Sequence, residues 1–212
     1  MTRSKPIVPF IAAWSGERPE RRPVLEDPYT GGIAYQREVF GDRDDHGVLW
    51  SRNDSRPGLG QPVYARVHPH RQRYVMRGLR CQICAGPADR NRLGVLWLLH
   101  DDRGDWPGWP EEMAATHPPV CLPCARLAAR LCPHLVGHHI AVRVRRPEVC
   151  GVHGQYYPTA RHGAGRLAPG RFMIVRYGDP RARRVLASQL VMRLSGCTLV
   201  DLAAELAAAG TP

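Results

Sequence analysis

The sequence predicts an α+β fold, in which a central cysteine-bearing module lies between an irregular N-terminal arm and a small C-terminal α/β segment. Three observations lead to this prediction. Two C-x-x-C pairs stand in the middle of the chain. Short stretches of helical and of strand periodicity surround them. Glycine contributes 21 and proline 20 of the 212 residues, which favours turns and short elements over long helices.

Three regions are predicted along the chain. Residues 1–62 form a turn-rich arm that docks on the body, with short strands at 33–39 and 47–51. Residues 63–135 form the cysteine-bearing module, which binds the metal discussed below. Residues 136–212 supply the C-terminal strands and two helices.

The elements of the module are predicted from periodicity and from the cysteine pairs. A helix is predicted over 67–79, because apolar residues recur at helical spacing and Pro69 suits a first helical turn. The run LGVLWLLH at 93–100 predicts a buried strand that forms one half of a hairpin. Another helix is predicted over 125–131, directly after the second cysteine pair.

Beyond the module, strands are predicted at 140–144 and 171–177, with a glycine-rich segment between them. Apolar residues at helical spacing predict an amphipathic helix over 181–194. A last helix is predicted over 199–208, where Thr198 supplies a capping side chain.

The two C-x-x-C pairs carry the strongest chemical signal in the sequence. Structural zinc takes four soft ligands in a tetrahedron, and each pair can place two sulfurs on one ion from a tight turn. Such pairs are typical of metal ligation in a reducing compartment, although redox chemistry or simple packing of thiols is the alternative. The predicted zinc ligands are Cys81, Cys84, Cys121 and Cys124. With four positions filled, no site is left for water, so the predicted zinc is structural and not catalytic.

A second set of cysteines and histidines has a less typical spacing for a metal site. Cys132 and His134 follow the predicted helix, and Cys150 and His153 come later in the chain. Together they offer two sulfurs and two imidazoles, so they form the candidate ligands of a second metal. Packing of these side chains against the helix is the alternative.

The net charge of +11 is unevenly distributed. Residues 61–100 carry seven basic side chains against one acidic, and residues 121–186 carry twelve against two. Such a field attracts phosphate, because neutralising phosphates releases condensed counterions. A solvated helix face and a genome that favours arginine codons are the alternatives. The predicted phosphate-contacting residues are Arg71, Arg73, Arg77, Arg80, Arg143, Arg145 and Arg146.

Several classes of protein are disfavoured by the sequence. No stretch approaches the roughly 18 apolar residues that a membrane span needs, and the N-terminal apolar run is too short for a good signal peptide. We therefore expect a cytoplasmic protein with no membrane partner. The sequence contains no G-x-S-x-G, no phosphate-binding glycine loop and no H-x-E of a zinc deaminase, so enzymatic activity is not expected.

Residues 67–135 resemble a treble clef of the HNH-nuclease type, a zinc scaffold with a basic helix, a C-x-x-C knuckle and a second C-x-x-C that opens a helix. The scaffold cysteines match. That family places an asparagine or histidine directly after the second pair, where this chain has Ala125, and the nearest counterpart of its base histidine is His100. The resemblance therefore implies a degenerate module without the full catalytic set. The segments HPHRQRYVMRGLRCQIC and PPVCLPCARLAARLCPHL are also similar to small zinc-finger proteins of high-GC actinobacteria.

Three functional hypotheses follow. The leading one is a zinc-stabilised basic protein that binds nucleic acid, DNA or RNA, or acts as a regulator without being an enzyme. The second is a protein–protein interaction or assembly factor, including a homo-oligomer, in which zinc only builds the docking surface. The third is a divergent HNH-like nuclease.

Overall fold

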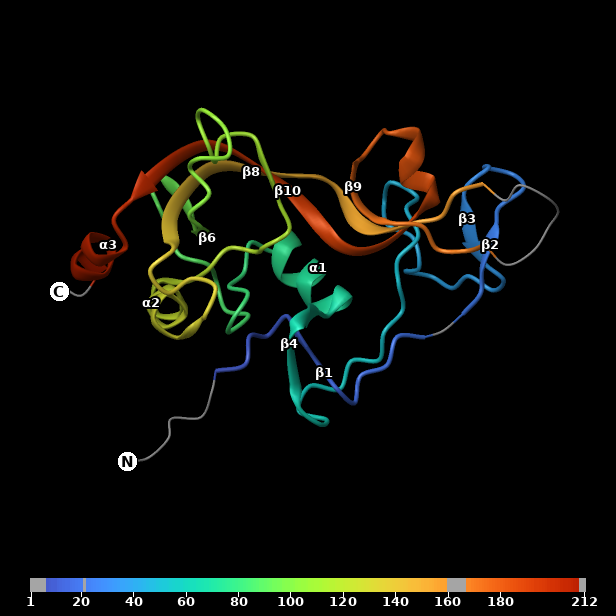
Figure 1. Cartoon of the computed structure of the whole chain (residues 1–212), viewed down its shortest axis with the longest axis horizontal. Coiled ribbons are helices and arrows are strands. Elements are labelled where there is room, and N and C mark those ends of the chain that lie inside the picture. The colour runs from blue at the N-terminus through green and yellow to red at the C-terminus, as the bar shows by residue number, and fades with distance from the viewer. Residues whose placement is uncertain (1–6, 21, 160–166, 210–212) are drawn as a thin grey trace. The chain divides into compact units, whose positions relative to one another are not determined.

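A computed structural model describes residues 7–20, 22–159 and 167–209, which form a mixed α/β structure (Figure 1). The chain divides into two compact units. The first unit comprises Met1–Ile11, Arg71–Val149 and Met192–Pro212, and the second comprises Ala12–His70 and Cys150–Val191. The three-region division made from the sequence stays a prediction. None of the helices in the described ranges is long and apolar enough to cross a membrane.

The first unit is built on a β-sheet. Its strands lie in the order β5 (Arg90–Asn91), β6 (Gly94–His100), β8 (His139–Tyr156), β10 (Val185–Val200) and β7 (Met113–Ala115). β5 and β6 form the hairpin that the sequence predicts, and β6 pairs antiparallel with β8 from Val95↔Val144 to His100↔His139. Five consecutive residues of β6 are buried, which explains its uninterrupted apolar sequence, because neither face of the strand is open to water.

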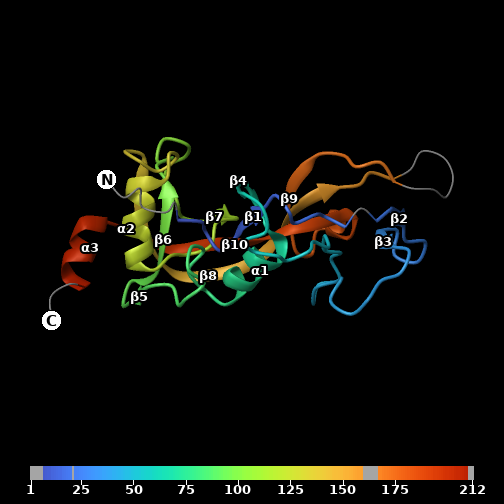
Figure 2. The ribbon, with the colours of Figure 1, turned by 90° about the horizontal axis from the view of Figure 1, so that it is seen from below.

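Two helices of the first unit cover this sheet. α2 (Leu122–Leu131) begins three residues earlier than the sequence predicts, and α3 (Leu202–Ala209) begins three residues later. The later start of α3 is explained by Asp201, whose carboxylate accepts the backbone N–H of Ala203 at 2.9 Å and caps the helix. Figures 1 and 2 both show α2 and α3 near β6. Their apolar side chains form one core with those of Leu96 and Leu98.

α1 (Pro69–Arg77) agrees with the predicted helix over 67–79. Its residues Val75 and Met76 are fully buried. The helix ends before Leu79, whose φ of 46° is left-handed. The N–H of Arg80 returns to the carbonyl of Val75 at 2.8 Å and leads the chain into the first cysteine pair.

The helix predicted over 181–194 is wrong. The structure has a short 3₁₀ helix at Pro180–Arg184, after which β10 runs from Val185 to Val200. Residues on both faces of β10 are buried, so the alternation expected of a half-exposed strand is missing and the apolar spacing imitates a helix. β8 likewise continues to Tyr156, into the first part of the predicted glycine-rich segment. A Cβ at Gly154 would lie 2.2 Å from the carbonyl oxygen of Leu186, so this glycine permits close strand packing and does not mark a loop.

The second unit contains short strand pairs and its own core. β1 (Ala12–Trp14) pairs with β4 (Pro62–Val67), β2 (Val24–Glu26) with β3 (Ile33–Tyr35), and β9 (Phe172–Arg176) with the end of β8. β3 is shorter than the predicted strand at 33–39. The strand predicted at 47–51 is reduced to single bridges, one of which joins Trp50 to Ala187. Val24, Ile33 and Leu49 lie in the core of this unit.

A buried ion-pair network ties α3 to the sheet of the first unit. Arg143 on β8 is 1% exposed. Its guanidinium donates to the carboxylate of Asp89 at 2.6 Å and to that of Glu205 on α3. The backbone of Asp89 also binds both neighbouring segments, since its N–H donates to Val120 and its carbonyl accepts from Leu96. Removing one member of such a network leaves the others without their counter-charge.

Replacing Arg143 with methionine is therefore expected to lower the free energy of unfolding by about 3 kcal/mol. Arg145, two residues further along β8, is exposed and supplies the matched control; Arg145→Met should change stability by no more than about 0.5 kcal/mol. Urea unfolding followed by tryptophan fluorescence measures both values. Equal losses in the two variants would contradict the structural role of the network.

Gly94 at the start of β6 is expected to tolerate no side chain. Its φ is +123°, and a Cβ would lie 2.1 Å from the carbonyl oxygen of Val144. Gly94→Ala should lower the free energy of unfolding by at least about 1–3 kcal/mol, through backbone strain and the collision with β8. Gly104→Ala is the control, because nothing lies within 4 Å of that position. Thermal unfolding measures the difference, and similar midpoints for the two variants would refute the expectation.

Candidate metal centre and basic surface

The four predicted ligand cysteines come together in the first unit. The sulfurs of Cys81, Cys84, Cys121 and Cys124 lie within 4.8 Å of one another, and all four thiols are free of disulfides. The Sγ atoms of Cys84 and Cys121 are 3.8 Å apart. A tetrahedral ion with metal–sulfur bonds of about 2.3 Å requires sulfur–sulfur separations of about 3.8 Å. The donor set and its spacing therefore fit a metal ion.

The first pair is held in a tight turn between α1 and β5. The N–H of Cys81 donates to the carbonyl of Gly86 at 2.8 Å, and the N–H of Ala85 returns to the carbonyl of Cys81 at 2.8 Å. Ala85 has a φ of 60°, which turns the backbone back on itself. This geometry presents both sulfurs on one side of the turn.

The second pair opens α2. Cys121 is the N-cap residue and has an extended backbone, but its side chain makes no capping hydrogen bond. Its sulfur is thus available to the cluster, while Cys124 lies in the first helical turn. The two cysteine turns are joined by backbone hydrogen bonds, because Gln82 donates to the carbonyl of Pro119 at 3.0 Å. This link brings together segments that are separated by 36 residues of sequence.

The electrostatics of the cluster favour a bound cation. Burial raises the pKa of the Cys121 thiol to about 11, and it raises the pKa of Cys124 even further. Burial also acts on Cys84, but hydrogen bonds from the Gly86 amide and the other cysteines outweigh it and lower the pKa of this thiol. Several thiolates so close together need positive charge between them. A divalent ion would supply that charge and hold all four as thiolates.

The cluster is continuous with the core of the first unit. Cys81 and Cys124 are buried, Cys121 is half-buried and Cys84 is exposed. Their neighbours in the core include Leu96, Val120 and Leu202. Four protein ligands at the edge of a hydrophobic core are typical of a structural ion and leave no coordination position for substrate.

The described residues contain no second cluster of metal-ligating side chains. Among the described residues, only the four cysteines above form a group of three or more metal-ligating side chains. Cys132 and His134 follow α2 in the first unit, whereas Cys150 and His153 lie on the part of β8 that belongs to the second unit. The second metal site stays a prediction.

The predicted phosphate-contacting arginines divide into buried and exposed groups. Arg71 is only 5% exposed, and Arg143 lies in the buried network with two carboxylates, so neither guanidinium has the exposed surface expected of a phosphate contact. Burial of a charge in a strand or helix cannot be recognised from the local sequence, because the compensating carboxylates are distant along the chain. Arg73, Arg77 and Arg80 of α1 and its C-terminal turn, and Arg145 and Arg146 of β8, are exposed or half-exposed.

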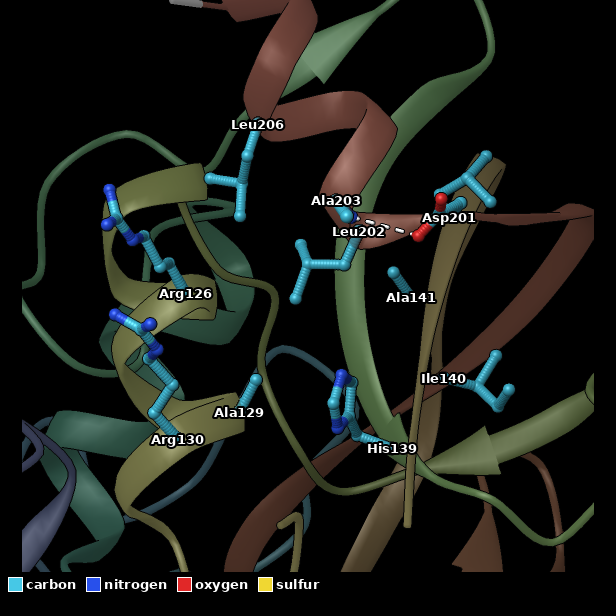
Figure 3. A pocket seen from close by; sticks show the side chains of 11 residues that line it. Arg126, Ala129, Arg130, His139, Ile140, Ala141, Asp201, Leu202, Ala203 and Leu206 are labelled. Atoms are coloured by element: carbon cyan, nitrogen blue, oxygen red, sulfur yellow. Dashed lines mark hydrogen bonds between the residues drawn. The ribbon is translucent and has the colours of Figure 1, made fainter. Parts of the chain in front are cut away.

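Two further arginines were missed by the sequence analysis. Arg126 and Arg130 are exposed on α2, one helical turn apart, and neither has an acidic partner among the described residues. They lie on the rim of a pocket of about 470 Å³ between α2, the start of β8 and α3 (Figure 3). The i, i+4 spacing within ARLAAR was the signal that could have identified this pair.

The positions that carry catalysis in HNH-type nucleases have other roles here. Ala125, directly after the second cysteine pair, is fully buried in the core of the first unit. His100 ends β6 and its Nδ1 lies 2.6 Å from a carboxylate oxygen of Asp102, with both side chains exposed. This pair is a local contact between two exposed side chains.

Comparison with known proteins does not assign the chain to a family. No protein-family model matches the chain, and no curated protein and no solved structure matches it. The resemblance to treble-clef proteins therefore depends on the motifs quoted above, and the functional interpretation depends on the geometry of the cysteine cluster and of the exposed arginines.

Proposed function

We propose that this chain is a non-enzymatic nucleic-acid-binding protein whose first unit is stabilised by a structural zinc ion. The observation that carries the proposal is a set of exposed arginines that form no ion pair within 4 Å with a carboxylate of the described residues, although Arg146 lies near enough to Glu111 to lower the pKa of that carboxyl. They lie on α2 and on β8 of the same unit, and they are Arg126, Arg130, Arg145 and Arg146. Unpaired guanidinium groups match phosphate in both charge and geometry.

Zinc is the ion that the donor set favours. Four thiolates in a tetrahedron are typical of zinc or of an iron–sulfur centre, and a single ion accounts for sulfurs about 3.8 Å apart. The order of a cysteine turn, the β5–β6 hairpin and a helix that carries the second pair in its first turn supports a treble-clef arrangement. In this proposal the ion joins two distant turns and takes no part in chemistry.

Two cysteine variants test the zinc proposal, because one is expected to lose the metal ion and the other to retain it. Cys121→Ser is expected to abolish the binding of one zinc ion per chain, and it should lower the thermal midpoint, because the four-sulfur shell is incomplete. Cys132→Ser should retain the ion, since Cys132 lies outside the cluster. Elemental analysis of the purified variants measures the metal content. Wild-type protein without metal, or full metal content in Cys121→Ser, would refute the proposal.

The salt dependence of binding tests the nucleic-acid proposal. Each phosphate contact contributes about 0.9 to the slope of log affinity against log salt, so replacing Arg145 and Arg146 together with alanine should reduce that slope by about 2. The control is the double variant Arg103→Ala/Arg181→Ala, which removes the same charge from arginines already paired with Asp101 and Asp179. Fluorescence anisotropy across salt concentrations measures both. Equal slopes for the two double variants would contradict a role of β8 in phosphate contact.

A second candidate function is protein assembly through α2. Leu127 and Leu131 are 39% and 58% exposed on this helix, and Val136 beyond its end is 49% exposed. An apolar stripe on a surface helix favours a protein partner or a second copy of the chain. Size-exclusion chromatography with light scattering tests the second-copy version; a monomer at high protein concentration would contradict it.

A further inference from the structure

The pocket between α2 and α3 joins two arginines of the proposed function, Arg126 and Arg130, to polar and apolar groups that the proposed function does not use. Its lining comes from α2, from the start of β8, from the end of β10 and from the first two turns of α3, all in the first unit. We infer that this pocket receives a single unstacked nucleotide of a nucleic-acid strand, and this inference rests on the proposed nucleic-acid binding. The pocket would make the protein prefer single strands over duplexes.

One side of the pocket suits a phosphate. Arg126 and Arg130 lie one above the other along α2, and Figure 3 shows them across from Leu202 and Leu206 of α3. Since neither arginine has an acidic partner among the described residues, both remain available to an external anion. Residues four apart on a helix are neighbours, so two guanidinium groups can reach the same phosphate.

The other side of the pocket presents hydrogen-bond acceptors. The Nδ1 of His139 lies 2.9 Å from the carbonyl oxygen of Leu135, and this contact assigns the ring proton to Nδ1. In the neutral imidazole Nε2 is then an acceptor, and it makes no hydrogen bond with another described residue. Asp201 uses one carboxylate oxygen to cap α3, and its second oxygen makes no hydrogen bond with another described residue.

The floor between these two sides is apolar. Ile140 and Ala141 of β8 and Leu202 and Leu206 of α3 line it. A flat base can cover such a floor while its exocyclic amino group donates to His139 or Asp201. A simple fatty acid would satisfy the arginines but would bring no donor for these acceptors, whereas a nucleotide carries an anion, a flat apolar face and amino donors together.

The volume of the pocket is suitable for one nucleotide. About 470 Å³ lies within the 300–1,000 Å³ of ordinary small-molecule sites. A base inside a duplex is stacked and paired, so it cannot enter without being extruded. Unpaired bases are available for insertion, which is why the inference predicts a preference for single strands.

The test uses a substitution that fills the pocket with a bulky side chain and leaves its charged residues unchanged. Ala203 is exposed, begins α3 and lines the pocket, so Ala203→Trp should fill it. Ala208→Trp adds the same side chain to the same helix at an exposed position outside the lining. Anisotropy titrations use a labelled mixed-sequence single-stranded oligonucleotide and a duplex of equal length, at one salt concentration.

Wild-type protein and Ala208→Trp are expected to bind the single strand about tenfold more tightly than the duplex, the size of one base–protein stacking contact. Ala203→Trp should lose that preference and bind the duplex as wild type does. Equal affinity of the wild type for both nucleic acids, or an unchanged preference in Ala203→Trp, would overturn the pocket inference while the proposed function stands. If neither nucleic acid binds, the proposed function fails and the pocket inference fails with it.

Discussion

The meeting of four sulfurs from two distant turns is the constraint on which the first unit depends. Without a cation, burial keeps the thiols of Cys121 and Cys124 protonated, because it raises both pKa values above the usual range. A bound cation would instead favour the thiolate form of these two cysteines, because its positive charge compensates for the loss of solvation. The cluster then acts as a crosslink between the turn after α1 and the start of α2, and it does so at the edge of the hydrophobic core.

The position of α2 follows from this crosslink. Cys121 is the N-cap residue of the helix and Cys124 lies in its first turn, so an ion held by the four cysteines would fix where the helix begins and in which direction its exposed face points. Arg126 and Arg130 occupy the next two turns. In the same core, Arg143 holds α3 through Glu205. The pocket lies between these two helices, so the cysteine cluster and the buried ion network together define its walls.

The cysteine cluster could be predicted from the sequence because its signal is local. Each C-x-x-C pair indicates a tight turn by itself. The prediction needed only one further assumption, that the two turns share one metal ion. The β5–β6 hairpin and α1 were also predicted, since their apolar periodicity is strong over one short window. The boundaries of α2 and α3 were less accurate, because α2 already begins beside Cys121, ahead of the predicted stretch, and α3 begins only after its capping residue Asp201, inside the predicted stretch.

Features that depend on distant contacts could not be predicted. β10 was taken for a helix over 181–194 because burial on both of its faces removed the alternation that marks a strand. Arg143 was taken for a surface residue, although its partners Asp89 and Glu205 lie 54 and 62 positions away. The pocket is formed by α2, β8, β10 and α3, and no local sequence pattern predicts that these four elements meet.

X-ray absorption at the zinc edge of the purified protein tests the central claim most directly. Four sulfur neighbours at about 2.3 Å, with no nitrogen or oxygen in the shell, is the result expected from the geometry of the four cysteines. A shell with fewer than four sulfurs, or protein that contains no zinc to absorb, would contradict the account of how the first unit is held together.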